Sequence, residues 1–104
     1  MGDSQSIYFN YQKALRQADR IDQAAEELSR VSGNEFQGAL QDLSTGWTGE
    51  SASLYFVKGD RLADDMNATA GELHQAAADL RTMARRLYEA EMAALAAAAD
   101  RTYH

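Results

Sequence analysis

Residues 62–87 read LADDMNATAGELHQAAADLRTMARRL, and this stretch decides the fold because its larger apolar residues recur at a helical spacing. The positions that carry them are Leu62, Met66, Leu73, Leu80, Met83 and Leu87. The same register extends outward from Ala52 to Ala94 and holds no charged residue. A repeat of about 3.5 residues kept over roughly six heptads is typical of a helix that packs along its length against other helices. The pattern predicts one long helix over residues 50–98.

The N-terminal half carries a less regular form of the same repeat, with Ile21 and Leu28 among its larger apolar residues. We predict a first helix over residues 10–44, with Asn10 as its N-cap, and a start at Ser4 or Ser6 as the alternative. Ile21 and Leu28 join the six larger residues of the second half in one apolar seam. This seam is expected to hold the hairpin and its dimer together.

The repeat of the first helix is interrupted near its middle. Glu35 stands where the next apolar residue is due, and the apolar stripe resumes at Phe36 and Leu40 as though residues had been inserted. Ser32-Gly33-Asn34 lies at the same place and combines three weak helix formers. A bend or a frayed turn is therefore expected there.

Between the two helical patterns lies Gly46-Trp47-Thr48-Gly49, which contains the only tryptophan of the chain. Glycine permits the backbone conformations that end a helix and reverse the chain, and tryptophan supplies a large apolar anchor. Residues 45–49 are thus predicted to form the turn of an antiparallel two-helix hairpin. The fold class is all-α, with residues 1–104 in a single domain and a frayed tail over residues 99–104.

Two paired helices cannot cover all the apolar surface that this sequence carries. A column of alanines, Ala63, Ala70, Ala77 and Ala84, runs beside the main seam. Large contiguous apolar patches usually mark a partner site. The expected remedy is a dimer of hairpins, which forms a four-helix bundle.

Composition excludes several classes of function. The net charge of −6 argues against nucleic acid and against anionic membrane surfaces as partners. Cysteine is absent, which excludes disulfides and thiolate metal sites. The first residues show no signal-peptide pattern, and no apolar run is long enough to predict a transmembrane helix. We expect no cofactor and no stable membrane insertion.

Catalytic and metal-binding patterns are also missing from the sequence. His74 has no second histidine or carboxylate at metal-ligand spacing, and a surface or interface position is expected for it. No nucleophile–histidine–acid trio, phosphate loop or paired carboxylates can be assembled. We therefore predict no catalytic, cofactor-binding or metal-binding residues and no enzyme activity.

In its length, its two amphipathic helices and its central Trp47-Thr48-Gly49, the chain resembles the WXG family. These are small helical-hairpin proteins exported by type VII secretion systems of Gram-positive bacteria and mycobacteria. The opening Ile7-Tyr8-Phe9-Asn10-Tyr11 is similar to that of many Firmicutes members. The resemblance implies dimerisation, recognition of Gly46, Trp47, Thr48 and Gly49 by the secretion ATPase, and secretion from the cytoplasm without a cleavable signal peptide.

The family resemblance also implies a second half of the export signal, a tyrosine followed four residues later by an acidic residue. Here Tyr88 is followed at that distance by Met92, so Glu91 at i+3 is the candidate acidic partner. The expected function is that of a leaderless substrate or co-secreted factor of a type VII system. The alternative is a cytoplasmic targeting partner that pairs with the helical N-terminal domain of a larger LXG-type toxin. A coiled-coil adaptor unconnected to secretion is a third, weaker hypothesis.

Overall fold

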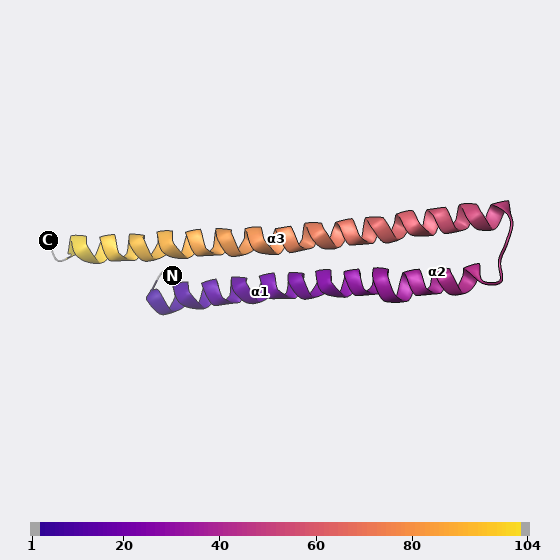
Figure 1. The fold of residues 1–104 in the computed structure, drawn as a ribbon. Coiled ribbons are helices and arrows are strands. Elements are labelled where there is room, and N and C mark those ends of the chain that lie inside the picture. Colours follow the sequence, from indigo (N-terminus) through magenta and orange to yellow (C-terminus); the bar gives the residue numbers. More distant parts are fainter. Residues whose placement is uncertain (1–2, 103–104) are drawn as a thin grey trace. The chain divides into compact units, whose positions relative to one another are not determined.

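A computed structural model describes residues 3–102, and within that range the chain is helical without any strand (Figure 1). The elements are α1 (Ser4–Arg30), the π-helix η1 (Val31–Phe36), α2 (Gln37–Ser44) and α3 (Glu50–Thr102). Residues 45–49 connect α2 to α3. The prediction of an all-α chain with two long helical segments is confirmed, and the architecture is that of a helical hairpin.

The described residues fall into two compact units, and each pairs a segment of the first helical half with a segment of α3. Unit 1 comprises residues 3–21 and 75–102, and unit 2 comprises residues 22–74. In unit 1 the ring of Tyr11 meets Tyr88, and Asp19 bonds Arg81, so the two segments run antiparallel. In unit 2 the tight connection between α2 and α3 imposes the same antiparallel pairing.

The start of α1 corrects the prediction of Asn10 as N-cap, because the helix begins at Ser4. The Asp3 side chain accepts a hydrogen bond from the Ser6 backbone N–H at 2.6 Å, and the Asp3 carbonyl accepts one from Ile7 at 3.0 Å. Asp3 thus satisfies donors that the first helical turn leaves without intrahelical partners. Ile7, only 3% exposed, is anchored in the core by this earlier start.

Alanine supplies most of the interior of this structure. In unit 2 the buried apolar residues are Ala25, Leu40, Ala52, Ala63 and Ala70. In unit 1 they are Ile7, Ala18 and Ala77. Small side chains let two helices approach more closely than leucines do, so the helical pair in each unit is held by close backbone packing.

The larger apolar residues were predicted to form the contact within the hairpin. The structure corrects this prediction. Leu62 is 50% exposed, Met83 64% and Leu87 61%. Ile21, Leu28, Met66, Leu73 and Leu80 are only partly buried. The alanine column placed beside the seam forms the contact instead, because the alanines at 63, 70 and 77 recur every seven residues and fit a closer helix pair.

The interruption in the first helix is a π-helical turn and not the expected bend or frayed turn. Residues Val31–Phe36 form η1, and the flanking residues Arg30 and Gln37 keep right-handed helical angles, so the helix continues through it. A π turn closes i→i+5 bonds and so absorbs one residue more per turn than an α turn. The spacing between buried residues accordingly changes from seven, at Ala18, Ala25 and Ser32, to eight at Leu40.

Two contacts with α3 accompany the change of register, one within η1 and one beyond it. Ser32 is fully buried, and its hydroxyl donates a hydrogen bond to the Ala63 carbonyl at 3.0 Å. One helical turn beyond η1, Leu40 fills the space above Gly59, where an added Cβ would lie 2.7 Å from a Leu40 methyl carbon. Gly59 is therefore a notch in α3 that receives the Leu40 side chain.

The C-terminal end of α3 also lies beyond its predicted boundary. The helix runs to Thr102 and not to residue 98, because the alanine run before it favours helix and Arg101 in the last turn complements the helix dipole. Of the predicted frayed tail, residues 99–102 are helical, and residues 103–104 lie outside the described residues. Within unit 1, α3 continues past the start of α1 (Figure 1).

Candidate interaction surfaces

The connection between α2 and α3 carries an exposed aromatic cluster. Trp47 is 47% exposed, and its ring lies 5.2 Å from the ring of Tyr55 and 6.1 Å from that of Phe56. Tyr55 and Phe56 also meet edge to face at 5.9 Å. Because the first two turns of α3 supply both of its partners, Trp47 rests on helical side chains and still presents about half of its surface to solvent.

The two glycines that flank Trp47 have different roles in this connection. Gly49 has a φ of +110°, and Gly46 does not have a positive φ. The Gly49 carbonyl accepts a hydrogen bond from the Ser53 N–H at 3.1 Å, which begins α3. Gly46 donates to Leu43 at 3.4 Å and closes the end of α2. Only Gly49 thus needs the conformational freedom of glycine.

We expect Gly49→Ala to lower the free energy of unfolding by about 1–2 kcal/mol, because a Cβ is strained at positive φ. No atom lies within 4 Å of the added Cβ at either glycine, so steric contact plays no part. Gly46→Ala is the matched control and should change stability by less than about 0.5 kcal/mol. Urea unfolding followed by circular dichroism measures both. Equal losses at the two positions would contradict the assignment.

A shallow apolar groove lies close to this cluster in unit 2. It is lined by Phe36, Leu40, Tyr55, Lys58, Gly59 and Leu62. Tyr55 thus borders both the groove and the aromatic cluster. Together they form an exposed apolar surface with Lys58 as its charged member.

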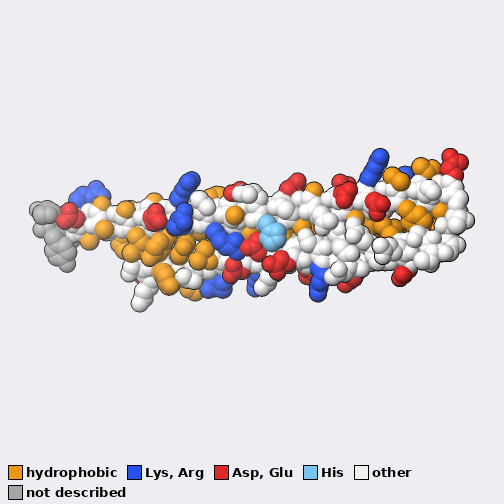
Figure 2. Space-filling model, in the orientation of Figure 1, with side chains coloured by type: hydrophobic (Ala, Val, Ile, Leu, Met, Phe, Trp, Pro, Cys, Tyr) orange, Lys and Arg blue, Asp and Glu red, His pale blue; other side chains and the backbone are white. Residues whose placement is uncertain are grey.

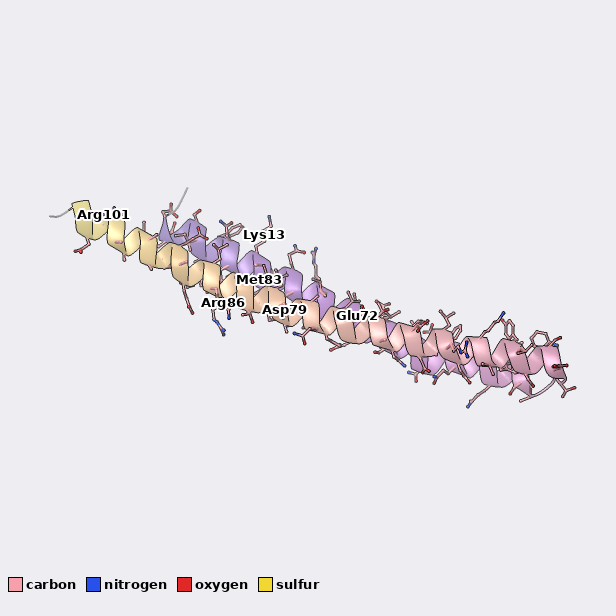
Figure 3. All side chains as sticks on the ribbon, turned by 90° about the horizontal axis from the view of Figure 1, so that it is seen from above. Lys13, Glu72, Asp79, Met83, Arg86 and Arg101 are labelled. Atoms are coloured by element: carbon pink, nitrogen blue, oxygen red, sulfur yellow. The ribbon has the colours of Figure 1, made fainter. Side chains whose placement is uncertain are left out.

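Unit 1 carries a second exposed apolar surface on the side of α3. Leu80, Met83 and Leu87 form its body, and Ala14, Ala84 and Arg86 complete the lining. Figure 3 labels Met83 and Arg86 on α3 and Lys13 on α1. We call this surface the Met83 face. On the Met83 face, Met83 is 64% and Leu87 61% exposed, whereas Leu80 is half-buried.

The charges of the two units are unequal. Unit 2 holds three lysines and arginines against ten aspartates and glutamates, whereas unit 1 holds seven against six. The acidic character of the whole chain therefore resides in unit 2. A partner that follows the whole hairpin meets a nearly neutral surface at unit 1 and an acidic one at unit 2.

Tyr88 and Glu91, the residues expected to carry the tail signal, lie against α1 in unit 1. The ring of Tyr88 stacks on Tyr11 at 4.8 Å and meets Tyr8 edge to face at 6.2 Å. Tyr88 and Glu91 also line one small hollow with Ile7 and Asn10. Figure 2 shows hydrophobic side chains gathered over this part of α1 and the α3 segment beside it. Trp47, the other half of the expected signal, belongs to unit 2.

Two polar side-chain pairs join the helical segments, one in each unit. In unit 1 Arg81 donates to Asp19 at 2.8 Å. In unit 2 His74 Nδ1 lies 2.8 Å from Asp22, and the histidine is visible in pale blue in Figure 2. Both pairs are largely exposed, so each contributes at most about 1 kcal/mol. The Asp22 carboxylate thus gives His74 a structural partner.

The described residues hold neither a metal-ligand cluster nor a membrane-spanning helix. Between residues 3 and 102 no group of three metal-ligating side chains comes together. No helix in that range has the length and apolarity to cross a membrane. Comparison of the chain with protein-family models, with curated proteins and with solved structures finds no match. The two exposed apolar surfaces and the aromatic cluster are therefore the features on which a function can be built.

Proposed function

We propose that this chain is a substrate or co-secreted factor of a type VII secretion system and that it works as a dimer of helical hairpins. The observation that carries the proposal is the aromatic cluster between α2 and α3. A tryptophan that is 47% exposed on two helical aromatic rings offers a ready anchor for another protein. Its sequence context, Trp47-Thr48-Gly49 between two long helices, is what resembles the WXG family.

The dimer is supported by the apolar side chains that the hairpin leaves outside. Met83 and Leu87 in unit 1 and Leu62 in unit 2 are each at least half exposed. A folded chain that exposes a row of large apolar residues gains most by covering them with a second helical pair. The predicted seam residues on these surfaces would then hold the dimer, while the buried alanines hold each hairpin.

Trp47→Ala tests the export role. We expect the purified variant to keep its helical content and its assembly, because Trp47 is 47% exposed and lies outside the buried core of the helical pair. Export of the variant from cells that carry the secretion system should fall by tenfold or more, measured as the ratio of secreted to cellular protein. Phe9→Ala is the matched control, since Phe9 is 60% exposed in unit 1 and should be dispensable. Unimpaired export of Trp47→Ala, or unfolding of that variant, would contradict the proposal.

One observation favours the alternative function, that of a targeting partner for an LXG-type toxin. Tyr88, the candidate tail residue, is engaged by Tyr11 and Tyr8, and Met92 stands where the acidic residue of the signal is expected. If a partner protein supplied the tail half of the export signal, this chain would not need to carry it. Sedimentation distinguishes the two functions. A stable dimer of twice 11.4 kDa supports self-pairing, and a monomer that forms a 1:1 complex with a toxin's N-terminal domain supports the targeting role.

A further inference from the structure

The π-helix η1 interrupts a register that the sequence itself continues. Ala18, Ala25 and Ser32 are buried at intervals of seven residues, and the next interval would place Ala39 toward α3. Four residues further, Leu43 would follow on the same face. In the structure η1 shifts the register by one residue, so that Leu40 is buried instead, while Ala39 is exposed and Leu43 is 46% exposed.

Both registers offer apolar residues to α3. In the observed register Leu40 fills the notch at Gly59, with its methyl carbons 2.7 and 2.8 Å from the position of an added Cβ. In the other register Ala39 would face position 59 and Leu43 would cover the following turn. Glu35 would move toward the edge of the contact between the helical segments. Partial burial of its charge is the main free-energy cost of this second register.

We propose that α2 has two packing registers on α3 and that η1 is the device that switches between them. If η1 turned into an α-helix, α2 would rotate by about 100°, the angle of one residue. Because α2 leads directly into the connection at residues 45–49, the rotation would lift Trp47 off Tyr55 and Phe56. The observed register places Trp47 against those rings, and the second register releases it. Both registers would exist whether or not the chain is exported.

Two contacts with α3 lie at η1 and just beyond it, and only the second is specific to the observed register. The Ser32 hydroxyl bonds the Ala63 carbonyl at 3.0 Å within η1, and Leu40 occupies the Gly59 notch beyond it. Ser32 is buried in either register, because both count from that position. The Leu40 contact exists only in the observed register, so its removal selects between the two.

Gly59→Ala is the selecting substitution. Its methyl group closes the notch to Leu40 and accommodates Ala39. We expect the variant to remain folded and to change the amide resonances of residues 31–47, including the indole N–H of Trp47. Resonances of unit 1 should stay in place. An unfolded Gly59→Ala variant would overturn the proposal, because a second register would rescue it.

The decisive measurement combines Gly59→Ala with Leu43→Gln. Leu43→Gln alone should lower the melting temperature little, because Leu43 is exposed in the observed register. In the double variant the Leu40 register is blocked and the Leu43 register buries an amide, so the melting temperature should fall by more than the sum of the two single shifts. Val57→Gln is the matched control, since Val57 is 49% exposed on α3 and its effect should add to that of Gly59→Ala. Additive shifts for Leu43→Gln would show that Gly59→Ala moves only the Leu40 side chain, and would refute the second register.

Discussion

Ala70→Asp should abolish the folded hairpin. Ala70 is 1% exposed between the helical segments of unit 2, so the new carboxylate would be buried without a partner. The cost of an unpaired buried charge is about 3–5 kcal/mol, which exceeds what a small two-helix unit can lose and remain folded. Circular dichroism of the purified variant should show loss of cooperative thermal unfolding.

Ala68→Asp is the matched control for this substitution. Ala68 lies two residues away on α3 and is exposed, so the same change there costs only helix propensity, below about 1 kcal/mol. A second variant, Ala70→Leu, separates space from charge. If the helices pack closely on alanine, the added volume should cost about 1–3 kcal/mol. A gain in stability for Ala70→Leu would show that the contact has room for leucine, and the alanine-based packing would be wrong.

The central role of Ala70 marks the limit of what the sequence could predict. The heptad spacing was sufficient for two long helices, because a period of about 3.5 residues runs through both halves and is interrupted once, near Glu35. The column of larger apolar residues through Leu73 and the column of alanines through Ala70 both repeat every seven residues, however. Spacing alone therefore does not decide which column faces the neighbouring segment. The general preference for larger apolar residues inside favoured Leu73. Close approach of the two helix backbones favours alanine. The distance between the backbones depends on the facing helical segment, and the periodicity of one helix does not determine it.

Local features were predictable to different degrees. The interruption at Ser32-Gly33-Asn34 was located correctly, but one extra residue can be absorbed by a bend or by a π turn. The right-handed helical angles of Arg30 and Gln37 identify the π turn, and the sequence pattern does not contain them. The N-cap at Asp3 was missed although its signal was present, since aspartate is one of the residues preferred at a helix N-cap. The bond between Arg81 and Asp19 could not be foreseen, because it joins residues 62 positions apart.

The aromatic cluster shows the same division between pattern and structure. Sequence spacing placed Trp47 in the connection between the helices, where the structure also has it. Its support by the rings of Tyr55 and Phe56 was not predicted. Two aromatic residues within the first two turns of α3 were the signal available for that contact.

Met83→Asp should prevent self-association and leave the hairpin intact. Met83 is 64% exposed on the Met83 face, so a carboxylate there remains hydrated in the isolated chain. In a symmetric dimer the interface would bury two copies of the substituted residue, one from each chain. At about 2 kcal/mol for each copy, the dissociation constant should rise by roughly a thousandfold. Sedimentation should then give 11.4 kDa, against twice that mass for the parent chain.

Ala78→Asp provides the comparison that assigns this effect to the Met83 face. Ala78 is exposed on α3 in the same unit, five residues before Met83 and therefore on a different side of the helix, so it adds the same charge away from the proposed contact. Its dimer should form with a dissociation constant within about threefold of the parent value. A dimer that survives Met83→Asp would move the interface to the groove of unit 2, beside Leu62. A parent chain that sediments as a monomer would exclude the homodimer and favour a helical partner of another sequence on the same exposed side chains.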